Sequence, residues 1–343
     1  MRLLVTGGAG FIGSNFVRWV LQHQPDVAVT NLDALTYAGN PESLKGIADN
    51  PRYTFVWGDI CDGSLLAELL PGHDAIVNFA AESHVDRSID SPVDFVRTNV
   101  QGAATLFDAA LRCEIPRFLH ISTDETYGSI AEPGSFREDD ALRPNSPYAA
   151  SKASADLLAR AYRVTHGYPI TITRTSNNFG PYHYPEKVVP LFMTNLLDGA
   201  KVPVYGDGRH VREWTYVLDN VRAQWLVLTE GDEGTTYNVS AGNEMTNLAL
   251  TYRILDHFGH TGAQADDLVE FVADRPGHDL RYAVDSTRLR ALGWTPQRSF
   301  DEAMEETIRW YRANEWWWRP LKRRGASRRQ GLSPRLPAPA TAG

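Results

Sequence analysis

The residues best suited to chemistry in this chain lie in two short stretches. Thr123, Asp124 and Glu125 come directly after an apolar run, and Tyr148 precedes Lys152 by four positions. An apolar run of this kind is typical of a buried parallel strand, and open α/β sheets bind their ligands just beyond the carboxyl ends of such strands. Positions i and i+4 share one face of a helix, so the tyrosine and the lysine can act together. Beside a dinucleotide site, this set of groups indicates oxidation coupled to elimination.

The two neighbouring carboxyl groups impose a geometric condition. Successive residues of a strand face opposite sides of the sheet. Asp124 and Glu125 therefore cannot both reach one pocket if the strand continues through them. We predict that regular strand geometry ends near Thr123.

A glycine-rich turn near the N-terminus predicts the dinucleotide site. Residues 7–13 read GGAGFIG, between a predicted strand at 2–6 and a predicted helix that runs to about residue 22. Glycines at this spacing permit a tight turn and let a pyrophosphate approach the N-terminus of a helix. Asp33 follows a second predicted strand at 27–32 and can accept both ribose hydroxyls, whereas it would repel a 2′-phosphate. The pattern favours NAD over NADP.

The order of the remaining elements predicts an α/β fold with a Rossmann-type doubly wound parallel sheet. Further strands are expected at 53–57, 74–79, 117–123 and 170–175, and helices at 92–113 and 148–166. Beyond residue 176 the alternation loosens into segments rich in Pro, Gly, aromatic and basic residues. We therefore expect an NAD-binding domain at 1–176 with a return segment near 211–230, a smaller substrate-binding lobe mainly at 177–320 with a last helix at 301–317, and a disordered tail at 321–343.

Composition narrows the possible partners. The net charge of −8 over 343 residues argues against binding to nucleic acid or to an anionic membrane. No apolar run reaches the ~18 residues of a membrane-spanning helix, and no secretory signal is recognisable. Cys61 and Cys113 show no CxxC spacing. We expect a cytoplasmic protein without a metal site.

Long motifs, in this order, carry a resemblance to a known family. They are TGGAGFIGS (6–14), NLDALTYAGN (31–40), GDI (58–60), AAESHVDRSI (80–89), STDETYGS (122–129), NSPYAASKA (145–153), NNFGPYHYPEK (177–187), GDGRHVREWTYVLDN (206–220) and RPGHDLRY (275–282). Over residues 1–320 the chain resembles the extended short-chain dehydrogenase/reductase superfamily and, within it, the dTDP-glucose 4,6-dehydratases. Thr126 and Phe179 depart from the more usual Val and Tyr, and neither is a presumed catalytic group.

The resemblance implies roles for individual residues. Tyr148 would take the proton of the sugar 4-hydroxyl, with Lys152 favouring its phenolate form and Thr123 hydrogen-bonding the same oxygen. Glu125 would remove the C5 proton, and Asp124, its pKa raised by burial beside Glu125, would protonate the departing 6-hydroxyl. NAD would be reduced and reoxidised within one turnover, and the product would be a 4-keto-6-deoxy nucleotide sugar that feeds deoxysugar biosynthesis.

The same resemblance implies the binding residues and the assembly. NAD would be held by Gly7, Gly10, Phe11, Ile12, Gly13, Asp33, Asp59, Ile60, Ala80, Ala81, Thr98, Tyr148 and Lys152. The substrate, dTDP-glucose, would be held by His84, Thr123, Asn178, Lys187, Pro203, Tyr205, Arg212, Asn247, Arg275 and His278. A homodimer is expected through helices 93–113 and 148–166.

Two other interpretations stay open at this point. The chain could be a 4,6-dehydratase for another nucleotide sugar, which the residues around Tyr205 and His278 would decide. It could also be a non-catalytic NAD-binding protein of the same fold, although the intact set at positions 123–125, 148 and 152 argues against this.

Overall fold

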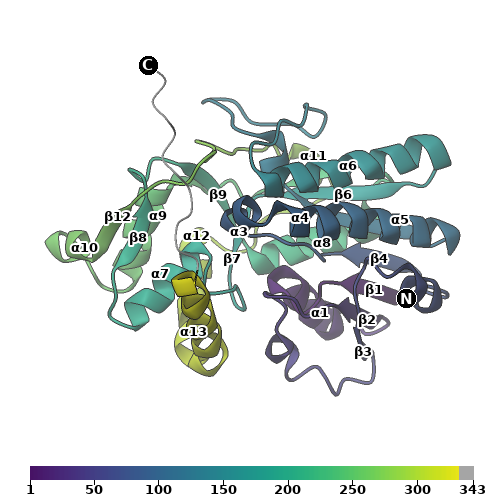
Figure 1. Ribbon diagram of the computed structural model, residues 1–343, viewed down its shortest axis with the longest axis horizontal. Coiled ribbons are helices and arrows are strands. Elements are labelled where there is room, and N and C mark those ends of the chain that lie inside the picture. Colours follow the sequence, from purple (N-terminus) through teal and green to yellow (C-terminus); the bar gives the residue numbers. More distant parts are fainter. Residues whose placement is uncertain (332–343) are drawn as a thin grey trace.

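The computed structural model describes residues 1–331, with side chains described through Arg324. Two parts stand side by side in Figure 1: a domain built around a large sheet, and a smaller lobe that contains most of the chain after residue 176. Within the described residues, no helix has the length and apolar character needed to cross a membrane.

The large sheet has seven strands, all parallel, in the order β10-β6-β5-β4-β1-β2-β3. Its strands are β1 (Arg2–Thr6), β2 (Ala28–Asp33), β3 (Tyr53–Trp57), β4 (Ala75–Asn78), β5 (Arg117–Thr123), β6 (Ile170–Thr175) and β10 (Thr236–Val239). The strand order reverses between β1 and β4, and ligands of doubly wound sheets bind at this switch point. The predicted fold class is confirmed.

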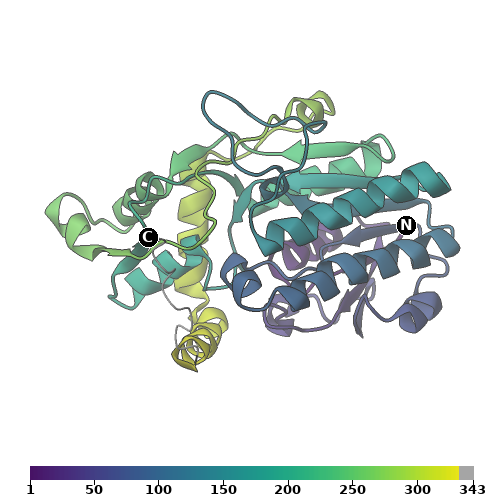
Figure 2. The same ribbon diagram turned by 45° about the horizontal axis from the view of Figure 1, so that its top comes forward.

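Helices cover both faces of this sheet, as Figures 1 and 2 show. One face carries α1 (Phe11–His23) and α8 (Val217–Glu230), which contact each other. The other face carries α2 (Gly63–Leu69), α5 (Ala103–Arg112) and α6 (Pro147–His166), with α3 (Val85–Asp90) and α4 (Pro92–Phe95) packed on α6. Each side has its own core, with Phe16 and Val221 buried on the first face and Leu106 and Ala155 on the second.

Two features of this domain differ from the sequence-based expectation. The helix predicted at 92–113 contains a π-helical segment, Val96–Gly102, between α4 and α5. The segment that returns to the large domain was predicted near 211–230, and in the structure it consists of α8 (Val217–Glu230) and β10 (Thr236–Val239). Residues 211–216 form β9 (Val211–Tyr216) in a different sheet, and the chain rejoins the large sheet through α8 and β10. Strand propensity alone does not reveal which sheet a strand joins.

The smaller lobe contains a three-stranded sheet, β11-β9-β7, and a two-stranded sheet, β12-β8. Its other strands are β7 (Asn177–Phe179), β8 (Val202–Tyr205), β11 (Glu244–Thr246) and β12 (Val269–Val272). The remaining helices are α7 (Val188–Leu197), α9 (Asn247–His257), α10 (Ala263–Leu268), α11 (Thr287–Ala291), α12 (Phe300–Ala313) and α13 (Glu315–Gly331). Of these, α11 contacts β10 of the large sheet.

The C-terminal end differs most from the prediction. The helix predicted at 301–317 is interrupted at Asn314, and α13 continues to Gly331, so the tail predicted as disordered from residue 321 begins inside a helix. Trp317, Trp318 and Leu321 are buried, and the Trp317 indole donates to Ser43 Oγ in the large domain at 3.1 Å. The composition of residues 319–329 is basic and by itself indicates a solvated tail. The tryptophans that anchor this helix come earlier in the sequence, so the composition of the tail does not show them. Residues 332–343 of the predicted tail lie outside the described residues.

Candidate active site

Strand β5 delivers three of the candidate catalytic residues to its carboxyl end. The strand ends at Thr123, and Asp124–Tyr127 form a 3-10 turn in which Thr123 Oγ1 accepts a hydrogen bond from the Glu125 amide at 3.3 Å. Thr123 also donates to Asp124 Oδ1 at 3.1 Å. The turn breaks the alternation of the strand, so both carboxyl groups line one cleft. The prediction that strand geometry ends near Thr123 is confirmed.

Helix α6 supplies the tyrosine and the lysine. Its N-terminus is fixed by Ser146, whose hydroxyl accepts from the Ala149 amide, and by Pro147 at the first helical position. Tyr148 therefore lies in the first turn, and Lys152 lies one turn later. The helix packs on β5, and Lys152 Nζ donates to the Ile121 carbonyl oxygen at 2.6 Å.

All five candidate catalytic residues line a cleft with an empty volume of about 1180 Å³. A second cavity of about 620 Å³ adjoins it along the glycine-rich turn and shares Gly7, Gly10 and Ala81 with it. Every residue expected to hold NAD lines one or both cavities: Gly7, Gly10, Phe11, Ile12, Gly13, Tyr148 and Lys152 the first, and Asp33, Asp59, Ile60, Ala80, Ala81 and Thr98 the second. The groove thus runs from the end of β2 to the carboxyl end of β5.

The glycine-rich turn fits a dinucleotide on steric grounds. Gly7 has φ +70°, and a Cβ there would lie 2.6 Å from the Ala80 amide nitrogen. A Cβ on Gly13 would lie 2.3 Å from the Gly7 carbonyl oxygen. Neither position tolerates a side chain, so the backbone at the N-terminus of α1 stays bare toward the groove.

Asp33 has both a structural and a binding position. Its carboxylate accepts from the Ala9 and Leu35 amides, each at 2.8 Å, and it lines the second cavity. Burial raises its pKa, and these two backbone hydrogen bonds oppose the rise. Asp33 therefore holds the glycine-rich turn against the end of β2, the place where an adenosine ribose would meet a carboxylate.

Asp124 is buried and Glu125 is half-buried, and different charges act on the two groups. Burial, then Glu125 and then Glu213 raise the pKa of Asp124 well above its usual value. Burial also raises the pKa of Glu125, whereas Arg275, Arg212 and Lys187 all lower it. Asp124 is thus favoured as the protonated acid and Glu125 as the carboxylate base. The predicted rise in the pKa of Asp124 is confirmed in direction.

The environment of the site shifts the pKa values of both the tyrosine and the lysine. Burial and Glu125 raise the pKa of Tyr148 well above 10, and a hydrogen bond with Thr123 opposes them. Burial lowers the pKa of Lys152 to about 8, while Asp156 acts to raise it. Burial therefore outweighs the hydrogen bond from Thr123 in the chain by itself, and the role of Lys152 in favouring the phenolate stays a prediction.

The residues expected to hold substrate fall into three groups. Thr123, Asn178 and Lys187 line the cleft. Arg212 and Arg275 lie close enough to act on the charge of Glu125. The others are not among the residues that line the cleft. His84 lies just before α3, Pro203 and Tyr205 lie on β8, Asn247 begins α9, and His278 lies on the loop after β12. Tyr205 and His278 meet edge to face, with ring centroids 6.5 Å apart.

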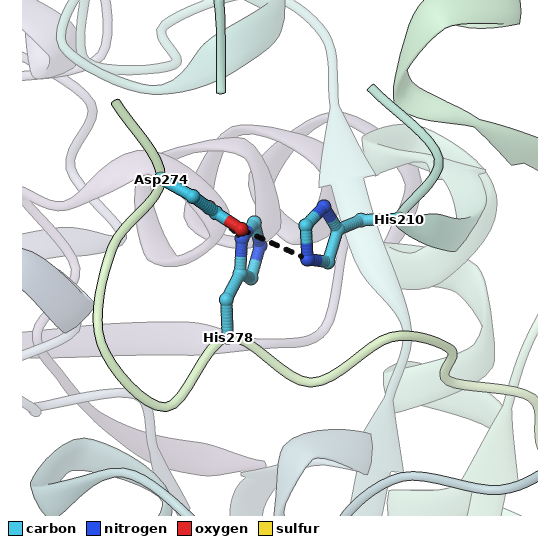
Figure 3. A group of neighbouring side chains, drawn as sticks. All are labelled: His210, Asp274 and His278. Atoms are coloured by element: carbon cyan, nitrogen blue, oxygen red, sulfur yellow. Dashed lines mark hydrogen bonds and ion pairs between the residues drawn. The ribbon is translucent and has the colours of Figure 1, made fainter. Parts of the chain in front are cut away.

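Sequence reasoning missed several polar residues at this site. Glu213 is buried, its pKa is raised to about 7 chiefly by burial, and it acts on Asp124. Asp86 of α3 accepts from Tyr205 Oη at 3.4 Å and from Arg275 Nη1 at 3.5 Å, so it links the two parts of the molecule. His210 and Asp274 contact His278 (Figure 3). In the motif GDGRHVREWTYVLDN, Glu213 follows Arg212 directly and His210 precedes it by two positions. Their closeness in sequence to Arg212 was the available signal that they belong to the site.

A dinucleotide groove that leads to two carboxyl groups and a tyrosine–lysine pair defines a class, the nucleotide-sugar enzymes of the extended short-chain dehydrogenase/reductase superfamily. Residues 4–307 match the family model described as GDP-mannose 4,6 dehydratase, and the chain belongs to that family.

Relatives narrow the likeness further. The chain is 52% identical over 327 residues to a dTDP-glucose 4,6-dehydratase of Streptomyces niveus, covering 94% of this chain and 96% of that protein. It is 55% identical over 311 residues to the low-salt glycan biosynthesis protein Agl12 of Haloferax volcanii, covering 91% and 98%. Among solved structures, the dTDP-glucose 4,6-dehydratase DesIV of Streptomyces venezuelae with NAD and TYD bound matches with a TM-score of 0.90 and 54% identity, covering 94% of this chain and all of the other.

Proposed function

We propose that the protein is an NAD-dependent dTDP-glucose 4,6-dehydratase, a hydro-lyase that converts dTDP-glucose to dTDP-4-keto-6-deoxyglucose for deoxysugar biosynthesis. The observation that carries the proposal is that two adjacent carboxyl groups, Asp124 and Glu125, line one cleft with Tyr148 and Lys152, and that three nearby cations lower the pKa of Glu125 while burial and Glu125 raise that of Asp124. Elimination of water needs an acid and a base at neighbouring carbons, and a pair that shares one cleft with different proton affinities supplies both.

The chain's own groups would act in sequence. Tyr148 would remove the proton from the sugar 4-hydroxyl, in reach of the Thr123 hydroxyl. Bound NAD would supply the acceptor for the hydride from C4 and the donor of the same hydride to C6. The 4-keto group makes the C5 proton acidic, and the Glu125 carboxylate would take it. Asp124 would give its proton to the 6-hydroxyl, which leaves as water, and Glu125 would return its proton to C5 when hydride is added at C6.

The cationic groups around the cleft fit a nucleotide diphosphate. Lys187 lines the cleft and donates to the Ser83 carbonyl oxygen at 2.8 Å, and Arg212 and Arg275 lie near Glu125. Guanidinium groups pair with phosphate oxygens through two parallel hydrogen bonds. The relatives that carry the narrower name support thymidine as the base and glucose as the sugar.

The test is turnover without added cofactor. The purified protein is incubated with dTDP-glucose, and the product is followed by mass and by the absorbance of 4-keto sugars in alkali. Loss of one water together with the alkaline signal is expected, and Tyr148→Phe serves as the matched inactive control. If the protein stays inactive with added NAD as well, UDP-glucose and GDP-mannose test the second candidate, a dehydratase for another nucleotide sugar. Inactivity on all three would favour the non-catalytic alternative.

We also propose a homodimer. Exposed apolar side chains gather on the neighbouring helices α4 and α6 and on the segment between α4 and α5, namely Val93, Val96, Leu157 and Val164. Exposed apolar side chains on paired helices are typical of a protein–protein contact. Light scattering after size-exclusion chromatography should give twice the chain mass, and Leu157→Glu should give the single mass. Phe271→Glu is the control, because Phe271 is 58% exposed against 57% for Leu157 and lies on β12, away from this face.

A cytoplasmic location stays a prediction, which cell fractionation would test.

A further inference from the structure

An ion pair lies at the outer end of the dinucleotide groove, where the second cavity passes the end of β3. Arg97 Nη2 lies 2.6 Å from Asp59 Oδ2, and both residues line this cavity. Asp59 comes two positions after β3, whereas Arg97 belongs to the segment between α4 and α5, 38 positions further along the chain. Arg97 was not among the residues expected to hold NAD.

The segment that carries Arg97 has an uncommon backbone. Residues Val96–Gly102 are π-helical, and short π-helical segments are rare and occur frequently at functional sites. This segment supplies two consecutive residues, Arg97 and Thr98, to the wall of the cavity. It also packs closely on the residues after β3, because a Cβ on Gly102 would lie 2.8 Å from Ile60 Cδ1. The packing holds the base of the Arg97 side chain beside the cavity.

Arg97 stands out among the charges that face this cavity. Three acidic residues line it, namely Asp33, Asp59 and Glu82, and Arg97 is the one basic residue among the described residues of its wall. Burial alone would raise the pKa of Asp59, but the Cys61 amide and Arg97 lower it below its usual value, so the carboxyl group is ionised. The Arg97 side chain is 55% exposed, and exposed ion pairs contribute little to stability. The pair therefore suits the binding of a ligand better than the support of the fold.

The order of the strands indicates which part of NAD meets this pair. Strands β1, β2 and β3 are neighbours in the sheet, about 4.8 Å apart. The glycine-rich turn after β1 fits the diphosphate, and Asp33 at the end of β2 fits the ribose. The residues after β3, one strand further out, are then left for the adenine base. Phe79, the one aromatic residue among the described residues that line this cavity, follows β4 and is separated from β3 by two strands. No aromatic ring of this wall therefore lies beside β3 to cover a base.

We propose that Arg97 is a cofactor-binding residue whose guanidinium group, tethered by Asp59, covers the adenine base of NAD. A guanidinium group is flat, stays charged and stacks on aromatic rings. Asp59 accepts a hydrogen bond from one edge of this group, so a ring can meet its face. The inference rests on NAD as the cofactor of the proposed function. It assigns to Arg97 the retention of a cofactor that is reoxidised within each turnover.

Binding of NAD to the full-length, NAD-free protein tests the assignment without any turnover. Arg97→Met should raise the Kd for NAD about three- to tenfold in a calorimetric titration, because it removes the flat cation. Arg112→Met is the matched control. Arg112 is also exposed and pairs with Asp108 at 2.8 Å, but it is not among the residues that line either cavity, so the Kd should not change. Without NAD, Arg97→Met should unfold at the wild-type temperature, because an exposed ion pair adds little stability.

Two further titrations locate the contact and identify its kind. ADP-ribose, which contains the adenosine and the diphosphate but no nicotinamide, should lose the same factor of affinity with Arg97→Met as NAD does. The loss should also persist in about 1 M salt, where the Debye length is about 3 Å and an effect of charge at a distance is screened.

The assignment is overturned if Arg97→Met keeps the wild-type Kd for NAD, if the affinity for ADP-ribose is unchanged, or if the loss vanishes in salt. A protein that binds NAD but does not convert dTDP-glucose would refute the proposed dehydratase activity and leave this contact standing. A wild type that binds no NAD would overturn both.

Discussion

Replacing Lys152 with methionine should make the protein more stable while abolishing its activity. Lys152 is 4% exposed, and burial lowers its pKa from 10.5 to about 8. At 1.36 kcal/mol per tenfold change in proton affinity, holding the ammonium in the fold at pH 7 destabilises the native state by about 3 kcal/mol. Methionine removes the charge but also the hydrogen bond to Ile121, which is worth about 1 kcal/mol. The net expectation at pH 7 is a gain of about 2 kcal/mol.

The sign of the pH dependence makes this prediction specific. The native state has the lower pKa, so between pH 8 and pH 10.5 it releases the proton while the unfolded chain keeps it. Stability of the wild type therefore rises with pH across this window, and the advantage of the variant shrinks. Urea unfolding of NAD-free protein at pH 7 and at pH 10 measures both differences, and Lys201→Met, at an exposed lysine, is the control. A variant that is less stable at pH 7, or one whose advantage is equal at the two pH values, would refute the reasoning.

Two other predictions concern the acid and the C-terminal helix. Asp124→Asn keeps the size of the side chain and the contact with Thr123 but has no proton to give. Formation of the 4-keto-6-deoxy product should therefore fall about 10²–10⁴-fold while reduction of bound NAD continues. Absorbance of the reduced cofactor separates the two steps, and an equal loss of both would contradict the assignment. A chain that ends at Arg324 should match the wild type in thermal unfolding and activity. A chain that ends at Asn314 loses the buried side chains of Trp317, Trp318 and Leu321 and should be destabilised by about 4 kcal/mol or more. Unchanged stability of this shorter chain would show that α13 is not part of the fold.

The sequence predicted the elements whose signals are local. Apolar runs located β1, β5 and β6 at their observed bounds, and the glycine spacing located the turn where Gly7 and Gly13 leave no room for a side chain. The carboxyl end of β5 was predicted to leave strand geometry because two adjacent carboxyl groups needed one pocket. These features depend on neighbours within a few residues, which is the range over which sequence patterns report structure.

The features that were missed or mistaken depend on contacts between distant segments. Asp86 contacts Tyr205 and Arg275, which are 119 and 189 positions away. The pKa of Tyr148 is raised chiefly by its burial among several elements and by Glu125, so a spacing of four residues to Lys152 could not give its direction. The helical state of residues 321–331 depends on anchors earlier in α13, including the indole of Trp317 on Ser43.

The acid–base division between Asp124 and Glu125 comes partly from outside the triplet that contains them. Burial raises the pKa of both groups, so burial alone does not distinguish them. The charges around them do. Arg275, Arg212 and Lys187 all act to lower the pKa of Glu125. For Asp124, the raising effects of Glu125 and Glu213 come before the lowering effect of Arg212. Because β9 belongs to the smaller lobe and Arg275 lies on a loop of the same lobe, the packing of that lobe against the end of β5 decides which carboxyl group holds the proton.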